Sequence, residues 1–247
     1  MAEKAGENVE IALFVCFILI ASILQTATGF GFSILATPFL LLLFTPMEAI
    51  QINLILSLVI SIALITKIKD HVDYGILKRF MIGSIVGLPI GILIFLHVDI
   101  TSLKIGVSLI ILLLTILLLL QFRVNQTKSR DGIVGGFSGL LTSSIGMPGP
   151  PLLLYFAGTD TQKDKLRATT LAFYLFIYSM SLGIQMLFIG TNKTVWVSSG
   201  FSLPLVIAGL YVGQLLFKRI NQQLFRIFTY AILLITGLYL LMDSFRP

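Results

Sequence analysis

Charged residues are scarce in this sequence. Asp, Glu, Lys and Arg make up 11% of the 247 residues, whereas they make up about a quarter of a typical soluble domain. Hydrophobic residues reach 57%, and long apolar runs leave too little polar sequence for a water-facing surface. The lack of charge excludes a soluble protein and predicts an all-α polytopic membrane protein with the lipid bilayer as its solvent.

Cysteine and histidine are nearly absent. Cys16 is the single cysteine, so disulfide, zinc and redox pairs are excluded, and we expect an apolar filler. His71 and His97 lie in or beside links, without carboxylates or cysteine at metal-ligand spacing. We therefore expect no metal, no cofactor and no catalytic residues, and hence no enzyme. The net charge of +6 does not indicate nucleic-acid binding, because the basic residues lie in short links between apolar runs.

The apolar residues fall into about ten segments. Six are long enough, or nearly so, to cross about 30 Å of hydrocarbon. The other four pair around the glycines at 29–31 and the glycine and proline run at 146–151. Because three of these four are too short to span the bilayer, each pair is predicted to form a broken, re-entrant helical hairpin.

The Lys and Arg residues predict the orientation of these segments. Most of them gather in four links, and short cytoplasmic links collect positive charge. These residues are Lys67, Lys69, Lys78 and Arg79; Arg123, Lys128 and Arg130; Lys163, Lys165 and Arg167; and Lys218, Arg219 and Arg226. The pattern is consistent only if one hairpin enters from the outer side and the other from the inner side.

This reasoning predicts two inverted repeats in the cell membrane of a bacterium or an archaeon, with both termini extracytoplasmic. Residues 1–10 form a short extracytoplasmic N-terminus, and residues 122–131 form a cytoplasmic linker. The first repeat, 11–121, contains a hairpin at 11–45 and spans at 47–66, 76–96 and 105–121. The second repeat, 132–247, contains a hairpin at 132–158 and spans at 168–189, 196–217 and 225–242.

Sequence similarity between the halves supports the repeat. Gly87 and Gly91 match Gly209 and Gly213 at an interval of 122 residues, and Gly29 matches Gly146 at an interval of 117. Inverted repeats with discontinuous helices are typical of secondary transporters, whose sites lie near the midplane where the repeats meet. For the glycines inside the continuous spans, close helix packing is the simpler interpretation.

The hairpin tips are the best candidates for a binding site. Non-helical backbone at membrane depth is tolerated only when it is buried in protein or lines a polar cavity. Half-helices that begin near Phe32 and Gly149 would point free N–H groups and positive dipole ends inward, where a small oxyanion binds readily. The prolines at 148, 150 and 151 donate no N–H, so the second tip should donate fewer backbone hydrogen bonds.

Hydroxyl and amide groups near the tips complete the predicted site, although Ser and Thr in spans also bond to their own helix. The candidate substrate-binding residues are Thr28, Gly29, Gly31, Phe32, Ser33, Asn53, Ser144, Gly146, Gly149 and Thr170. We expect Arg167 and Glu48 to be solvated at the edges of their spans, with Arg167 able to attract anions at the inner mouth. Tyr174 is expected to pack, although it could reach the cavity. Ionisable residues deep in a span are not expected, which disfavours cation coupling.

The segments TGFGFSILATPFLLLLFTPMEAI (28–50) and GGFSGLLTSSIGMPGPPLLLYF (135–156) resemble the TauE/SafE family of sulfite exporters. Members usually carry a further glycine where Phe32 and Pro148 stand here. The resemblance implies export of a small sulfur-containing oxyanion, such as sulfite or an organosulfonate. Our leading hypothesis is a transporter in which the two tips meet around the substrate and one repeat rocks against the other. A carboxylate transporter, a passive anion channel, and a membrane enzyme or assembly partner of a sulfur pathway stay open, as does a monomeric or homodimeric state.

Overall fold

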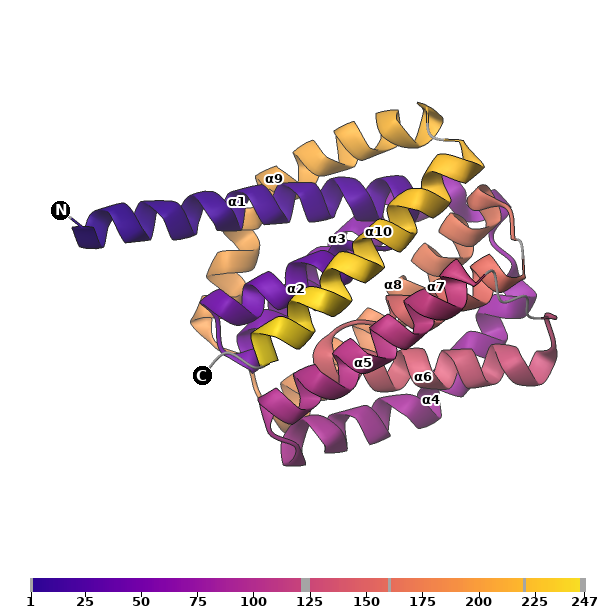
Figure 1. The fold of residues 1–247 in the computed structure, drawn as a ribbon, viewed down its shortest axis with the longest axis horizontal. Coiled ribbons are helices and arrows are strands. Elements are labelled where there is room, and N and C mark those ends of the chain that lie inside the picture. The colour runs from indigo at the N-terminus through magenta and orange to yellow at the C-terminus, as the bar shows by residue number, and fades with distance from the viewer. Residues whose placement is uncertain (1, 121–124, 160, 220, 245–247) are drawn as a thin grey trace.

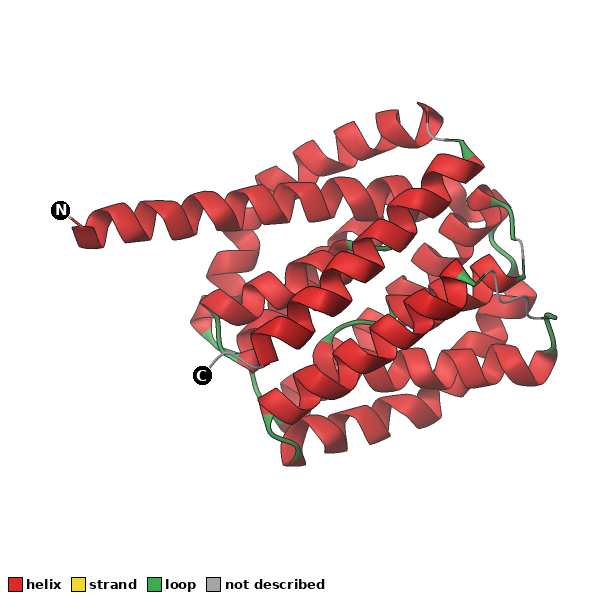
Figure 2. Ribbon diagram, in the orientation of Figure 1, coloured by secondary structure: helices red, strands yellow, loops and turns green. Residues whose placement is uncertain are grey.

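The computed structural model describes residues 2–120, 125–159, 161–219 and 221–244, and within these ranges every regular element is a helix (Figure 2). A short 3-10 helix, η1 (Lys69–His71), follows α3. The α-helices are α1 (Ala2–Thr28), α2 (Phe32–Leu43), α3 (Pro46–Ile68), α4 (Tyr74–His97), α5 (Ile100–Leu119), α6 (Lys128–Ile145), α7 (Gly149–Gly158), α8 (Lys163–Phe188), α9 (Lys193–Arg219) and α10 (Gln222–Ser244).

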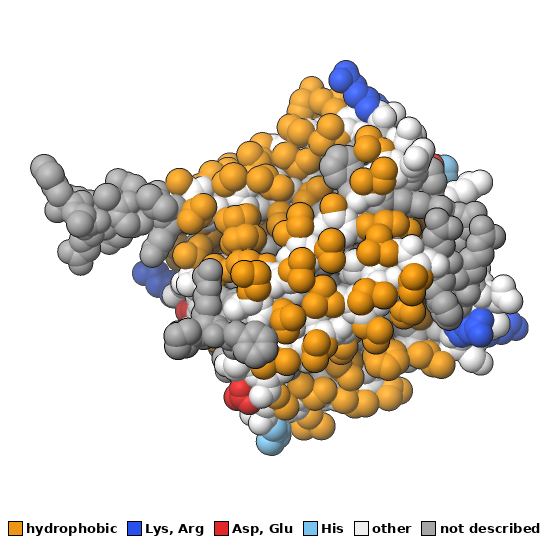
Figure 3. Space-filling view, viewed as in Figure 1, with side chains coloured by type: hydrophobic (Ala, Val, Ile, Leu, Met, Phe, Trp, Pro, Cys, Tyr) orange, Lys and Arg blue, Asp and Glu red, His pale blue; other side chains and the backbone are white. Residues whose placement is uncertain are grey.

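Five of the described segments are long and apolar enough to cross a membrane. They are Ile11–Thr28, Pro46–His71, Tyr74–His97, Lys163–Phe188 and Lys193–Arg219. The spans predicted at 105–121 and 225–242 fall mostly on α5 and α10, although the structure does not describe several of the side chains of these two helices. Figure 3 shows a broad apolar face over the helices, with charged side chains near their ends, as expected of a protein solvated by lipid.

Apart from the two breaks at 29–31 and 146–148, the helices begin and end at two opposite ends of the molecule (Figure 1). Helices α3, α5, α7 and α9 end at the right in Figure 1, whereas α1 begins and α2, α4, α8 and α10 end at the left. The four links predicted to be cytoplasmic from their basic residues therefore share one end. Local capping sets the start of the helix that follows one of these links. The Thr127 hydroxyl accepts a hydrogen bond from the Arg130 N–H, so α6 begins inside the predicted linker 122–131.

The helices pack as two bodies that do not coincide with the sequence halves. α4 packs along α6 and against α8, and α5 packs against α7. In the same way, α9 packs along α1 and against α3, and α10 packs against α2. We group α4–α8 as one body (the central body) and α1–α3, α9 and α10 as the other (the terminal body). The two bodies are extensively joined, because α5 contacts α10 more than it contacts α7, α8 contacts α3 more than it contacts α4, and α2 contacts α7.

Each body has its own buried apolar cluster. One cluster is formed mostly by α4 and α6–α8, and includes Phe80, Leu152 and Phe173. The other is formed mostly by α1–α3 and α9, and includes Ile18 and Ile52. Exchanging α1–α5 for α6–α10 converts most of the main helix pairings into other observed pairings, but the pairing of α2 with α3 has no counterpart between α7 and α8 among the main contacts.

Glycines bring the paired helices into backbone contact. A Cβ atom at Gly83 or Gly87 of α4 would overlap the carbonyl oxygen of Gly132 or Gly136 in α6. A Cβ atom at Gly213 of α9 would lie 2.6 Å from Cβ of Thr26 in α1 and 2.7 Å from the Ile23 carbonyl oxygen. Because only glycine fits such approaches, the predicted packing role of the span glycines is confirmed.

Candidate functional site

The two hairpins are broken where the sequence predicts. The first half-helix ends at Thr28 and the next begins at Phe32, whereas in the second hairpin the break lies between Ile145 and Gly149. Gly29 (φ 86°), Gly31 (φ 110°) and Gly146 (φ 75°) adopt left-handed backbone. L-residues with side chains rarely adopt these angles, so glycine is required for the turns.

The first tip packs against α8 of the other body. A Cβ atom on Gly29 would lie 2.8 Å from Cα and 3.0 Å from Cγ of Arg167. Arg167 Nε donates a 2.9 Å hydrogen bond to the Thr26 carbonyl, one of the carbonyls left free at the end of α1. Thr28 Oγ1 lies 2.7 Å from the Leu24 carbonyl oxygen and 2.5 Å from the Phe30 carbonyl oxygen, so its single proton is donated to one of them or shared between them at the turn.

The second tip packs against α3 in a corresponding way. A Cβ atom on Gly146 would lie 2.8 Å from Nδ2 of Asn53 and 3.3 Å from Cγ2 of Ile50. Asn53 Nδ2 donates a 2.8 Å hydrogen bond to the Gly146 carbonyl. Ile50 and Arg167, the residues that the two tip glycines touch, are separated by the same 117 residues as Gly29 and Gly146. The two tips are therefore held by equivalent positions of α3 and α8.

Two buried tyrosines of α8 extend into the tip region. The Tyr174 hydroxyl would lie 2.9 Å from a Cβ atom on Gly149, beside the first turn of α7. It is fully buried and has no hydrogen-bond partner among the described residues. Tyr178, one turn further along α8, places its hydroxyl 3.4 Å from Oγ of Ser33 in the first turn of α2. The N-terminal ends of α2 and α7 therefore each have a tyrosine hydroxyl beside them.

Other buried polar atoms of α1, α3 and α8 have no hydrogen-bond partner in the described part of the chain. They are Gln25 Oε1, Thr26 Oγ1, Asn53 Oδ1, Arg167 Nη2, Thr170 Oγ1 and Gln185 Oε1. Buried polar groups are normally paired, because an unpaired one costs about 1–3 kcal/mol. Asn53, Arg167 and Tyr174 lie against the tip glycines, and unpaired groups at that place are chemically suited to a small polar ligand.

The predicted site residues take different positions in this region. Ser144 Oγ donates to the Leu140 carbonyl and Thr28 Oγ1 to that of Leu24 or Phe30, so these hydroxyls bond to the backbone of their own hairpins. Phe32, at a position where the family usually has glycine, is fully buried in the apolar cluster of the terminal body. Thr170 of α8 is buried, and its hydroxyl has no hydrogen-bond partner among the described residues.

The expectation that Arg167 is solvated at the edge of its span is wrong. Its exposed fraction is 6%, because Gly29 and Phe217 cover it. The guanidinium carbon lies 4.1 Å from the Phe217 ring centroid, a geometry that stabilises a buried cation. Sequence reasoning missed this because Phe217 lies on α9, 50 positions away.

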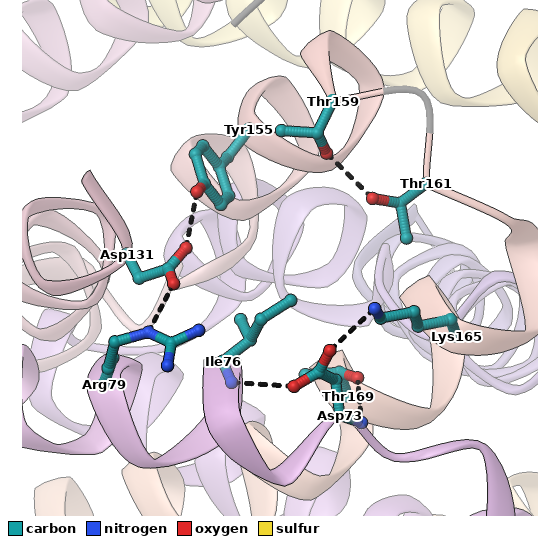
Figure 4. Close-up of polar contacts among 9 residues, drawn as sticks. All are labelled: Asp73, Ile76, Arg79, Asp131, Tyr155, Thr159, Thr161, Lys165 and Thr169. Atoms are coloured by element: carbon teal, nitrogen blue, oxygen red, sulfur yellow. Dashed lines mark hydrogen bonds and ion pairs between the residues drawn. The ribbon is translucent and has the colours of Figure 1, made fainter. Parts of the chain in front are cut away.

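A cluster of charged and polar side chains connects α4, α6 and α7 at the end of the molecule that carries the basic links (Figure 4). Asp131 of α6 is fully buried. Its two carboxylate oxygens lie 2.5 Å from Nε of Arg79 in α4 and 2.5 Å from the hydroxyl of Tyr155 in α7. The sequence does not predict that Asp131 is buried, because Asp131 lies in the predicted linker 122–131, whereas in the structure it belongs to the first turn of α6.

The neighbouring ion pair fixes the link before α4 to α8. Asp73 Oδ2 lies 2.6 Å from Nζ of Lys165, and the Asp73 N–H donates to Thr169 Oγ1 at 3.0 Å. Partial burial raises the pKa of the Asp73 carboxyl, but the hydrogen bonds from Lys165 and from the Ile76 N–H outweigh it and leave that pKa below its usual value. Asp73 is therefore ionised at neutral pH.

The apolar spans and the two discontinuous hairpins that meet through α2 and α7 define the class as a polytopic helical membrane protein built like a transporter. The chain matches the sulfite exporter TauE/SafE family over residues 13–240. It therefore belongs to this family of membrane anion exporters. Comparison with curated proteins and with solved structures gave no match.

Proposed function

We propose that this chain is a secondary transporter that exports a small sulfur-containing oxyanion, such as sulfite or an organosulfonate, bound between the two hairpin tips. The observation that carries the proposal is the pairing of two half-helix N-termini, α2 and α7, with buried hydroxyls that have no partner among the described residues. Helix N-termini and unpaired hydroxyl donors stabilise an oxyanion without a metal ion.

The donors would act together on the oxygens of the anion. The first turn of α2 supplies backbone N–H groups near Ser33, whereas Pro150 and Pro151 leave fewer at the start of α7. Tyr174 compensates for this deficit, because its hydroxyl lies beside Gly149. The tripod of oxygens on a sulfite or sulfonate group would thus receive backbone donors from one tip and mainly side-chain donors from the other.

The moving units that we propose are the central and terminal bodies, rather than the two sequence halves. The glycine contacts of α4 with α6 and of α9 with α1 tie each hairpin to a span of the opposite half. The tips lie where the two bodies meet, so rocking of the bodies would open the site to one side at a time. The hinges would be the links at 72–73 and 189–192, where Gly190 has a φ of 89°.

The inverted repeat, with boundaries at 11–121 and 132–247, fits the exchange of helix pairings and the shared interval of 117 residues. In this orientation the basic end of the molecule faces the cytoplasm and both termini lie outside. In a Cys16→Ser background, a cysteine at position 192 should react with an impermeant maleimide added outside intact cells. A cysteine at position 125 should not react, and the opposite labelling would contradict the orientation.

Transport is tested with purified protein in liposomes loaded with sulfite, methanesulfonate or acetate. We expect protein-dependent flux of the sulfur oxyanions, with accumulation against a gradient when a gradient of a second ion is imposed. Flux that only dissipates the anion gradient, whatever second gradient is applied, would show a passive anion channel. Preferred acetate flux would show a carboxylate transporter, and no flux of any anion would contradict the proposed function.

A further inference from the structure

Arg167 carries a buried charge that forms no direct ion pair with a described carboxylate. It belongs to neither of the ion pairs that the structure describes, and Asp164, one turn earlier in α8, stabilises its charge through space without a direct ion pair. The Thr26 carbonyl takes the Nε–H, and the Phe217 ring covers one guanidinium face. Nη2 has no partner among the described residues. A buried cation satisfied in this incomplete way is stabilised by an anion beside it.

The position of Arg167 places that charge at the first hairpin tip. Its Cα and Cγ are the atoms that a Cβ on Gly29 would touch first, so the guanidinium lies within one side-chain length of the turn that leads to α2. A purely structural role is also present, because a cation beside the Thr26 carbonyl stabilises the C-terminus of α1. That role occupies Nε and leaves Nη2 available for a ligand.

We propose that Arg167 makes the tip site selective for doubly charged oxyanions over singly charged ones. This inference rests on the proposed anion site. The positive charge around that site is one full charge from Arg167 plus roughly half a charge from the N-terminus of each of α2 and α7, or about two in all. The position on α3 equivalent to Arg167 is Ile50, and the polar contact to the second tip comes from the neutral Asn53. Arg167 thus supplies the only full charge that touches either tip in the described residues.

The test compares two anions that share three oxygens on sulfur and differ in charge. Calorimetry on the purified protein measures the affinity for sulfite, at an alkaline pH where it carries two negative charges, and for methanesulfonate, which carries one. The variants are Arg167→Gln and Arg167→Lys. The matched control is Arg219→Gln, which removes an exposed charge from the last turn of α9 at the same end of the molecule.

We expect the wild-type protein to prefer sulfite, and Arg167→Gln to lose about tenfold or more in sulfite affinity, the usual effect of losing a charge-assisted hydrogen bond. Methanesulfonate affinity should fall much less, so that the preference collapses. Arg167→Lys should keep part of the preference, and Arg219→Gln should keep all of it. Equal losses for both anions, or none, would overturn the charge-selection role alone. A wild-type protein that binds neither anion would instead overturn the proposed site itself.

Discussion

Asp131 shows how one buried carboxylate can fix three helices. It joins α6 to Arg79 of α4 and to Tyr155 of α7 through both of its oxygens. Removing one partner of a buried ion pair costs more than the pair contributes, because the other group is left without its counter-charge. The second hairpin therefore depends on this residue for its attachment to the central body, far from the tip itself.

We expect Asp131→Asn to destabilise the protein by about 2 kcal/mol, below the usual cost of breaking a buried pair, because the Arg79 side chain is 29% exposed and keeps some hydration. Thermal unfolding of the detergent-solubilised protein measures the change. Asp99→Asn is the matched control, since Asp99 accepts the Ser102 N–H at an exposed helix start, where asparagine caps equally well. Equal melting temperatures for Asp131→Asn and wild type would contradict the role of this cluster.

At the level of residues, the sequence predicts the glycines of the tips and the starts of α2 and α7, because positive φ angles and helix starts have strong local signals. It does not predict Arg167 or Asp131, whose burial depends on Phe217 and Tyr155 from other helices. For Tyr174 the sequence predicts packing, although the side chain could reach the cavity; in the structure Tyr174 is fully buried in the apolar cluster, and its hydroxyl lies beside Gly149. Contacts between residues that lie far apart in the chain produce no periodic pattern in a single sequence, so they cannot be predicted from it.

At the level of elements, the pair α4 and α6 is joined by backbone contact along most of its length. Gly83 and Gly87 face α6, while Gly135 and Gly139 of α6 face Phe80 and Ser84 of α4. This reciprocal arrangement excludes lipid and favours dispersion contacts, the main source of helix association in membranes. The predicted spans and hairpin segments fall on helices of the structure. Hydropathy does not predict which of these helices pack against each other.

Gly87→Ala should separate α4 from α6, because the added methyl group would overlap the Gly136 carbonyl oxygen. We expect a loss of about 3 kcal/mol, the upper end of the usual cost of overpacking, measured as a lower unfolding temperature and a smaller monodisperse peak on size exclusion. Gly200→Ala is the control, since a Cβ atom at Gly200 would have no neighbouring atom within 4 Å and alanine favours helix there. Comparable stability of the two variants would show that the helices adjust without cost.

At the level of the whole molecule, our proposal is that the exchange of spans between the sequence halves determines which parts move. The central body keeps α4 and α5 of the first half, and the terminal body keeps α9 and α10 of the second half. Lys163 of the central body lies 4.8 Å from the Phe217 ring of the terminal body. Lys67 and Gln214, in contrast, form a 3.3 Å hydrogen bond within the terminal body. These two contacts lie at the same end of the molecule and provide a matched pair.

In a Cys16→Ser background, a reducible bismaleimide that joins cysteines at positions 163 and 217 should stop transport, because it fixes the two bodies together. Reduction of the linker should restore transport. The same linker between cysteines at positions 67 and 214 should leave transport unchanged, because both residues belong to one body. Inhibition by the second pair, or continued transport with the first pair fully linked, would contradict motion of these two bodies.

The central claim is that the hairpin tips bind the transported anion, and sulfite flux through tip variants in liposomes tests it most directly. In Gly149→Val the side chain would meet the Tyr174 hydroxyl at 2.9 Å and Cδ1 of Ile34 at 3.1 Å, and in Gly31→Val it would strain a turn with a φ of 110°. We expect both variants to insert and purify as folded protein yet lose sulfite flux, whereas Gly200→Ala keeps it. Wild-type flux in both folded tip variants would show that the tips serve the fold and that the anion passes elsewhere.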